Sequence, residues 1–128
     1  MKVPSENIEA ESLANWLRGN NYMFTHIANE SWLPPKVAML SAMRKKRMWL
    51  SPWFPDFCIV LNRKSLLFIE LKRQKPVSKT WKILKSPSVV SPEQILWVEI
   101  LNTIPNIEAH ICYGFKEAKA IIEELENK

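Results

Sequence analysis

The chain has 128 residues, a formal net charge of +5 and a hydrophobic content of 47%, which predicts one globular domain over residues 1–128 and argues against disorder. Its two glycines exclude a Gly-rich phosphate loop, and its two histidines and two widely separated cysteines, Cys58 and Cys112, argue against a zinc site. The N-terminus lacks an apolar signal core and no apolar run is long enough to cross a bilayer, so we expect a cytoplasmic protein with reduced cysteines.

The apolar periodicity predicts helices and strands in the order α-β-α-β-β-α-β-α. Ser5 and Ser91 are the expected caps of two helices, and residues 73–90 are expected to form a loop rich in lysine, proline and serine. This order predicts an α/β fold with a central mixed sheet flanked by helices. The expected helices are 5–18, 36–47, 92 to about 103 and 115–126, and the expected strands are 22–28, 56–61, 66–71 and 108–114.

Positive charge is concentrated in one part of the chain. Residues 36–85 hold 13 Lys/Arg and two acids, a local balance of +11, whereas the remaining residues hold 5 Lys/Arg and 11 acids, a balance of −6. A basic band on an otherwise acidic protein indicates a polyanionic partner such as DNA. A solvated charged face is the alternative interpretation.

The two acids within the basic band are Asp56 and Glu70. Strand alternation places Glu70 and Lys72 on one face, and the hairpin between the two expected strands brings Asp56 to the same end of the sheet. Adjacent carboxylates repel each other unless a cation lies between them, and oxygen ligands suit Mg²⁺ or Mn²⁺. Lys72 would then stabilise the charge that builds on a phosphate. A cross-strand ion pair between Glu70 and Lys72 is the simpler alternative.

The stretches "PDFCIVLNRKSLLFIELK", "SPEQILWVEIL" and "AHICYGFKEAKAII" resemble the VRR-NUC family of the PD-(D/E)XK nuclease superfamily. The resemblance implies a restriction-endonuclease-like core and a divalent metal. It implies that Asp56, Glu70 and the backbone carbonyl of Leu71 bind the metal, that Lys72 is the catalytic lysine, and that Gln94 lies near the site.

The resemblance also implies an acid from the first helix. Glu9 is the best match, because its helical position puts it on the apolar face of Leu13 and Trp16 that must pack on the sheet. Glu6 is the second choice. His26 and Asn29 would border the site, although a purely structural role is the alternative for His26.

The chain departs from the family pattern in two places. Trp49 and Trp53 stand where small residues are usual, and they either stack on unpaired bases or pack in the core. The loop after Lys72 is longer than is typical, and it is either a flap that grips DNA or a solvated loop. The expected DNA-binding residues are Arg44, Lys45, Lys46, Arg47, Arg73, Lys75, Lys79, Lys82 and Lys85.

These observations predict a small metal-dependent endonuclease of the phage or prophage type that acts on DNA in the bacterial cytoplasm. We expect a homodimer that cuts branched DNA in the manner of Holliday junction resolvases, because a twofold dimer presents two identical sites for paired cuts. A non-catalytic nucleic-acid-binding module that retains the fold is the first alternative. The second is an interaction protein whose basic band meets an acidic partner.

Overall fold

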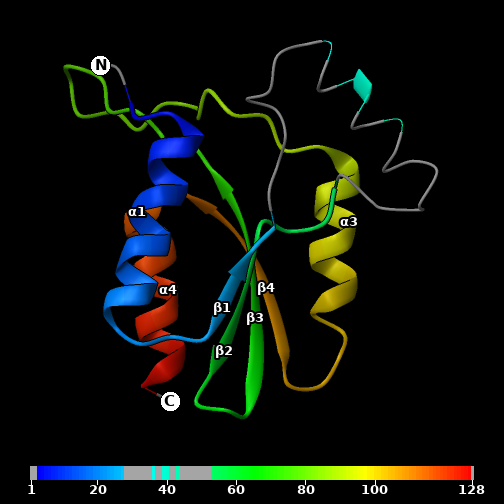
Figure 1. Cartoon of the computed structure of the whole chain (residues 1–128). Helices are drawn as coiled ribbons and strands as arrows, with labels where there is room; N and C mark the ends of the chain where they lie inside the picture. The colour runs from blue at the N-terminus through cyan, green and yellow to red at the C-terminus, as the bar shows by residue number, and fades with distance from the viewer. Residues whose placement is uncertain (1–2, 28–35, 37–38, 41–42, 44–52, 128) are drawn as a thin grey trace.

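The structure, a computed structural model, describes residues 3–27, 36, 39–40, 43 and 53–127. Within these residues four strands form one sheet, and helices α1, α3 and α4 pack against it (Figure 1). In chain order the elements are α1 (Glu6–Gly19), β1 (Phe24–His26), β2 (Phe57–Leu61), β3 (Ser65–Lys72), α3 (Pro92–Leu101), β4 (Ile107–Tyr113) and α4 (Phe115–Glu126).

The strands lie in the order β1-β2-β3-β4. The pairs β1/β2 and β2/β3 are antiparallel, whereas β3 and β4 are parallel, so the sheet is mixed. Parallel neighbours cannot be joined by a tight turn, and the long connection that contains α3 makes this crossover. Phe57 pairs with Ile69, and Lys72 pairs with Tyr113, which sets the register at the end of β3.

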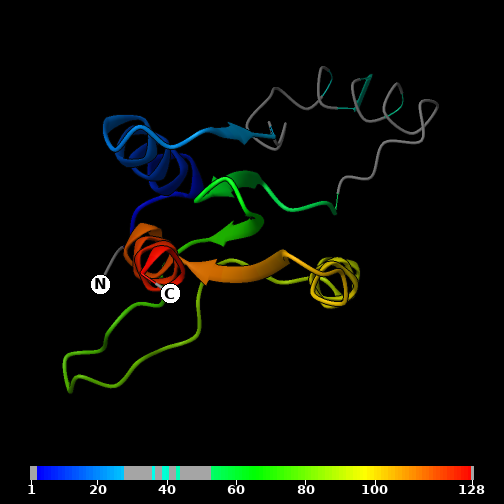
Figure 2. The ribbon, with the colours of Figure 1, turned by 90° about the horizontal axis from the view of Figure 1, so that it is seen from below.

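The two faces of the sheet have separate apolar clusters. Figure 2 shows α1 and α4 together on one side of the sheet and α3 on the other. Residues of β3 alternate between these clusters, with Ile69 packed in the α1/α4 cluster and Phe68 in the α3 cluster. Each fully buried large side chain of this kind stabilises the fold by roughly 1.5–3 kcal/mol. The buried α1/α4 cluster consists of Leu13, Leu17, Phe57, Ile59, Leu61, Leu67, Ile69, Leu71, Cys112, Ala118 and Ile122.

Local capping explains where α1 and α3 begin. The Ser5 hydroxyl accepts a hydrogen bond from the Ile8 N–H at 3.3 Å. Ser91 and Gln94 form a reciprocal capping box at the start of α3, with Pro92 in the first turn. Both expected caps are therefore present, and the chain enters each helix with its first amide groups satisfied.

The predicted mixed sheet flanked by helices is confirmed. Most element boundaries agree within two residues, but β1 is limited to Phe24–His26, and Tyr22 instead stacks on Trp16 with ring centroids 5.6 Å apart. Of the predicted helix 36–47, the four described positions are helical and the others lie outside the described residues. No helix in the described part of the chain is long and apolar enough to span a membrane.

Candidate active site

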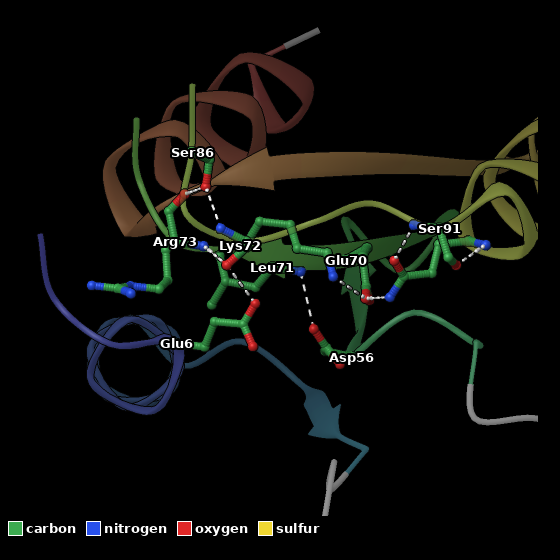
Figure 3. A network of polar contacts seen from close by, with 10 residues as sticks. Glu6, Asp56, Glu70, Leu71, Lys72, Arg73, Ser86 and Ser91 are labelled. Atoms are coloured by element: carbon green, nitrogen blue, oxygen red, sulfur yellow. Dashed lines mark hydrogen bonds and ion pairs between the residues drawn. The ribbon is translucent and has the colours of Figure 1, made fainter. Parts of the chain in front are cut away.

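Asp56, Glu70 and Lys72 meet at the end of β3 (Figure 3). The Lys72 Nζ lies 3.7 Å from the Glu70 Oε1. Asp56 precedes the Phe57–Ile69 pair by one residue, so the antiparallel register puts it opposite Glu70. Its Oδ2 accepts a hydrogen bond from the Leu71 N–H at 3.0 Å. The structure thus brings together the three residues that the sequence pattern selected.

Gln94, in the first turn of α3, contacts this group through Glu70. Its side-chain Nε2 donates to the Glu70 Oε1. Its Oε1 accepts from the Ser91 N–H at 3.0 Å, so the capping box fixes the orientation of the amide. A residue that caps its own helix therefore also holds the Glu70 carboxylate in place.

Burial disfavours the charged form of both acids, and the neighbouring Asp56 adds to this effect at Glu70. Burial raises the pKa of Glu70 to about 8, with a further rise from the negative charge of Asp56 and an opposing effect of Lys72. Burial also raises the pKa of Asp56, against the hydrogen bond from Leu71. The Glu70 Oε2 is buried and has no hydrogen-bond partner among the described residues. A cation placed between these carboxylates would relieve both effects.

Glu6, at the start of α1, is the first-helix acid nearest to the pair. Its negative charge contributes to the raised pKa of both Asp56 and Glu70. The Ser88 hydroxyl donates to the Glu6 Oε1 at 2.8 Å, and the Ser88 oxygen accepts from the Arg73 N–H at 3.0 Å. Ser88 was not selected from the sequence, where only the clustered serines around Pro87 marked this stretch. In the part of the chain that the structure describes, no three His, Cys, Asp or Glu residues form a cluster that could hold a metal ion.

Glu9, the preferred first-helix acid, lies elsewhere. Its Oε2 accepts from the Phe115 N–H at 2.6 Å, so it caps the start of α4. The helical phase was correct, since Glu9 is buried with the apolar stripe of α1. However, that stripe packs on the face of the sheet opposite to α3, whereas Glu70 points toward Gln94 on α3. The structure therefore does not bring Glu9 to Asp56 and Glu70.

The aromatic and histidine predictions have mixed outcomes. The His26 ring stacks on Phe57 at a centroid distance of 4.4 Å, and the nearby imidazole contributes to lowering the pKa of Asp56, so His26 does border the group. Trp53 is 41% exposed, next to Phe54, whose ring packs on Trp97. The predictions for Asn29, Trp49 and residues 44–47 (Arg44, Lys45, Lys46 and Arg47) fall outside the described residues.

The Arg73 side chain has partners within the molecule, and its expected role in DNA binding stays a prediction. Its guanidinium donates to the carbonyl oxygens of Val3 at 2.7 Å and Pro4 at 2.9 Å. The sequence placed Arg73 in the basic band but gave no sign of these backbone partners. By contrast, the four expected lysines of the following loop are exposed: Lys75, Lys79, Lys82 and Lys85.

Comparison with known proteins supports the fold. The sequence matches no protein-family model and no curated protein. A solved structure described as "VRR_NUC domain protein" is similar over 97% of this chain and 89% of its own, with a TM-score of 0.68 and 19% sequence identity. At this identity the likeness concerns the fold. The chain therefore shares its fold, a mixed sheet flanked by helices, with that VRR_NUC domain protein, as the sequence resemblance predicts.

Proposed function

We propose that the protein is a divalent-metal-dependent endonuclease that cleaves phosphodiester bonds of DNA. One observation carries this proposal. The buried Glu70 carboxylate keeps one oxygen without a hydrogen-bond partner among the described residues, beside Asp56 and Lys72. A buried polar atom without a partner costs about 1–3 kcal/mol. A buried carboxylate oxygen without a partner, next to a second acid, is the arrangement expected of a cation site.

The donor atoms fit Mg²⁺ or Mn²⁺. Asp56 and Glu70 supply hard carboxylate oxygens. The Leu71 N–H points to Asp56, and because the N–H and C=O of a strand residue project to the same side, the Leu71 carbonyl also faces this edge of β3. We propose Glu6, in place of Glu9, as the acid that α1 contributes. When bound, the metal would supply a Lewis acid and lower the pKa of a water molecule.

The protein's own residues would perform three tasks. Lys72, 7% exposed, presents a positive charge beside Glu70 and would stabilise negative charge on the phosphate. Gln94 holds the Glu70 carboxylate through its side-chain amide. The exposed lysines after β3 would bind neighbouring phosphates and position the nucleic acid.

The finer proposal concerns substrate and assembly. We propose that the substrate is branched DNA, such as a four-way junction, and that a homodimer cuts it. We propose that the protein acts in the cytoplasm of a bacterium and is of phage or prophage origin. The supporting argument is one of symmetry, because paired cuts across a junction need two identical sites. The basic band of residues 36–85 supports a nucleic acid as partner.

A non-catalytic nucleic-acid-binding module is the second candidate. One observation favours it: the described residues do not contain a ready-made cluster of three metal-binding side chains. In such a module the Glu70–Lys72 pair and the Gln94 hydrogen bond would be structural remnants. It would bind DNA without metal and leave it intact.

The test is incubation of the full chain with labelled linear, flapped and four-way DNA, and with RNA, in Mg²⁺, in Mn²⁺ and in EDTA. We expect metal-dependent cleavage that is lost in Glu70→Gln. Glu108→Gln is the matched control, because Glu108 is a half-exposed acid that pairs with His110 at 3.6 Å on β4. Binding without cleavage in every metal would instead establish the non-catalytic module.

A further inference from the structure

The loop after β3 contains a small ordered hairpin, residues 76–84, which we name the Trp81 arm. Val77 and Ile83 form a β-bridge across it. The Ser78 N–H donates to the Lys82 carbonyl at 2.9 Å, and the Lys82 N–H donates to the Ser78 hydroxyl oxygen at 3.0 Å. The arm projects beyond the N-terminal end of α1, clear of the sheet (Figures 1 and 2). It is therefore a built element and not simply a solvated loop.

Trp81 stands at the tip of this arm and is 85% exposed. Its backbone has φ +65°, which is unfavourable for a bulky residue, and its N–H donates to the Ser78 carbonyl at 2.9 Å. The turn thus holds an indole in solvent at a cost in backbone strain. Lys79 and Lys82 flank it and are exposed, and residues 73–90 contain no acid. An exposed ring among cations suits a partner that offers both flat apolar faces and negative charge.

A groove of about 490 Å³ runs along the base of the arm. Apolar residues Ile83, Leu84 and Val89 line it, together with Lys75 and Lys85. The Lys75 Nζ lies 4.4 Å from the centre of the Tyr113 ring, which fixes that charge at the groove. The groove repeats the chemistry of the tip, with apolar surface beside positive charge.

Hydrogen bonds fix the base of the arm to the candidate site. The Ser86 hydroxyl donates to the Arg73 carbonyl at 2.6 Å, immediately after Lys72. The Arg73 N–H donates to Ser88, and Ser88 donates to Glu6 (Figure 3 shows the Glu6, Arg73 and Ser86 side chains). A strand bound by the arm would therefore be held in a defined position relative to Asp56 and Glu70.

We propose that the Trp81 arm binds unpaired nucleotides of the substrate, with a base stacked on the indole and the flanking phosphates on Lys79 and Lys82. This rests on the proposed function and specifies its substrate: nucleic acid with a single-stranded segment beside the cleavage site. Duplex fits less well, because its bases are stacked on each other and offer no free face to Trp81. Stacking on aromatic rings and a cationic track are the two parts of single-strand recognition.

Binding to a labelled oligo-dT and to a labelled blunt-ended duplex of two strands, measured by fluorescence anisotropy on the full chain in EDTA, tests this proposal. Trp81→Ala should weaken oligo-dT binding about 5- to 100-fold and duplex binding less than about twofold. Trp81→Phe should retain most of the affinity, because a ring remains. Met23→Ala is the matched control: Met23 is 75% exposed and precedes β1, at the opposite end of the sheet.

The lysines provide a second readout. Replacing both Lys79 and Lys82 with Ala should make the salt dependence of oligo-dT affinity shallower by about 0.7 for each lost phosphate contact. The same change at Arg63 and Lys64, in the β2–β3 turn, should leave it unaltered.

Oligo-dT affinity that is unchanged in Trp81→Ala, equal losses for oligo-dT and duplex, or Trp81-dependent binding to anionic phospholipid vesicles without oligo-dT binding would each overturn the proposal. Because these measurements use EDTA, they stand apart from catalysis. Trp81-dependent binding without any cleavage would support the role of the arm and contradict the proposed nuclease activity. Cleavage by a protein whose oligo-dT binding does not depend on Trp81 would support the nuclease activity and contradict the role of the arm.

Discussion

Glu9 and Glu70 are buried to nearly the same degree, at 5% and 3% exposure, yet their carboxylates have different surroundings. Glu9 lies between α1 and α4 and accepts the Phe115 N–H at the start of α4. Glu70 lies on the α3 face, where it meets Lys72, Gln94 and a second acid, and one of its oxygens has no hydrogen-bond partner in the described chain.

The surroundings of the carboxylate distinguish two uses of a buried acid. A carboxylate at a helix N-terminus is stabilised by backbone N–H groups and the helix dipole, so it serves the fold. A carboxylate next to another acid is destabilised by it, and such a pair is typical of a cation site or an active site. Changing each acid in turn tests whether the two carboxylates have these separate roles.

The largest contrast should be in cleavage. Asp56→Asn should lower metal-dependent DNA cleavage by more than about 100-fold, because it removes a carboxylate that would hold the metal. Glu9→Gln should retain activity within a few-fold once folded, because an amide oxygen can still accept the Phe115 N–H. Single-turnover rates on the best DNA substrate measure both. Comparable losses of cleavage rate in the two variants would contradict the separate roles of Asp56 and Glu9.

The next effect concerns pH and stability without metal. The pKa of Glu70 is about 8 in the folded state and 4.5 for a free side chain, so the folded protein binds more protons between these values. The free energy of unfolding should therefore fall as pH rises from about 5 to 8, by at most about 1.4 kcal/mol per pH unit for this group. Urea unfolding in EDTA should show this slope, and Glu70→Gln should flatten it. If the free energy of unfolding depends on pH in the same way in both proteins, the pKa of Glu70 is not raised in the folded state.

The structural role of Glu9 can be tested at the chain's two glycines. A Cβ on Gly114, which has φ +96°, would lie 2.5 Å from the Glu9 Oε2 and 2.8 Å from the Gln74 Cβ. Gly114→Ala should cost about 1–3 kcal/mol of stability. Gly19→Ala is the matched control, since no neighbouring atom lies within 4 Å of its added Cβ and alanine favours a helix by up to about 1 kcal/mol. Thermal unfolding that ranks the two variants in the opposite order would contradict this assignment.

The smallest expected effect is that of Glu6. Glu6→Gln keeps a group that can accept from Ser88 but removes the charge that acts on Asp56 and Glu70. We expect a loss of about tenfold in cleavage, with little change in stability. Raising the Mg²⁺ concentration should recover part of the rate if the loss is in metal affinity. A fully active Glu6→Gln protein would leave α1 without a part in the site.

The sequence predicted the elements well because capping and strand alternation are local. Ser91, Pro92 and Gln94 fixed the start of α3, and the alternation around Glu70 fixed which side chains share a face. It did not identify which acid of α1 lies near Asp56 and Glu70, because that depends on which face of the sheet the helix covers. The helical phase of Glu9 was right, but no local signal says that α1 packs opposite α3.

Long-range backbone contacts were equally hidden from the sequence. Arg73 donates to carbonyl groups about seventy residues away, and Ser88 to a carboxylate at the start of the chain. Backbone carbonyl acceptors carry no sequence signature, because every residue has one. The charge of Arg73 therefore gave no sign that its guanidinium binds backbone carbonyls near the start of the chain.

The Trp81 arm lies within the connection from β3 to β4, which must be long in any case because these strands are parallel. The Ser86 hydroxyl donates to the Arg73 carbonyl and the Arg73 N–H donates to the Ser88 hydroxyl, and these two bonds close the arm at its base. A change in the arm beyond them therefore need not move the sheet. Doubling the length of a closed loop costs only about 0.6 kcal/mol. Evolution can therefore lengthen, shorten or replace the arm while Asp56, Glu70 and Lys72 keep their positions. Under the proposed function, the choice of substrate and the breaking of the bond can then diverge independently.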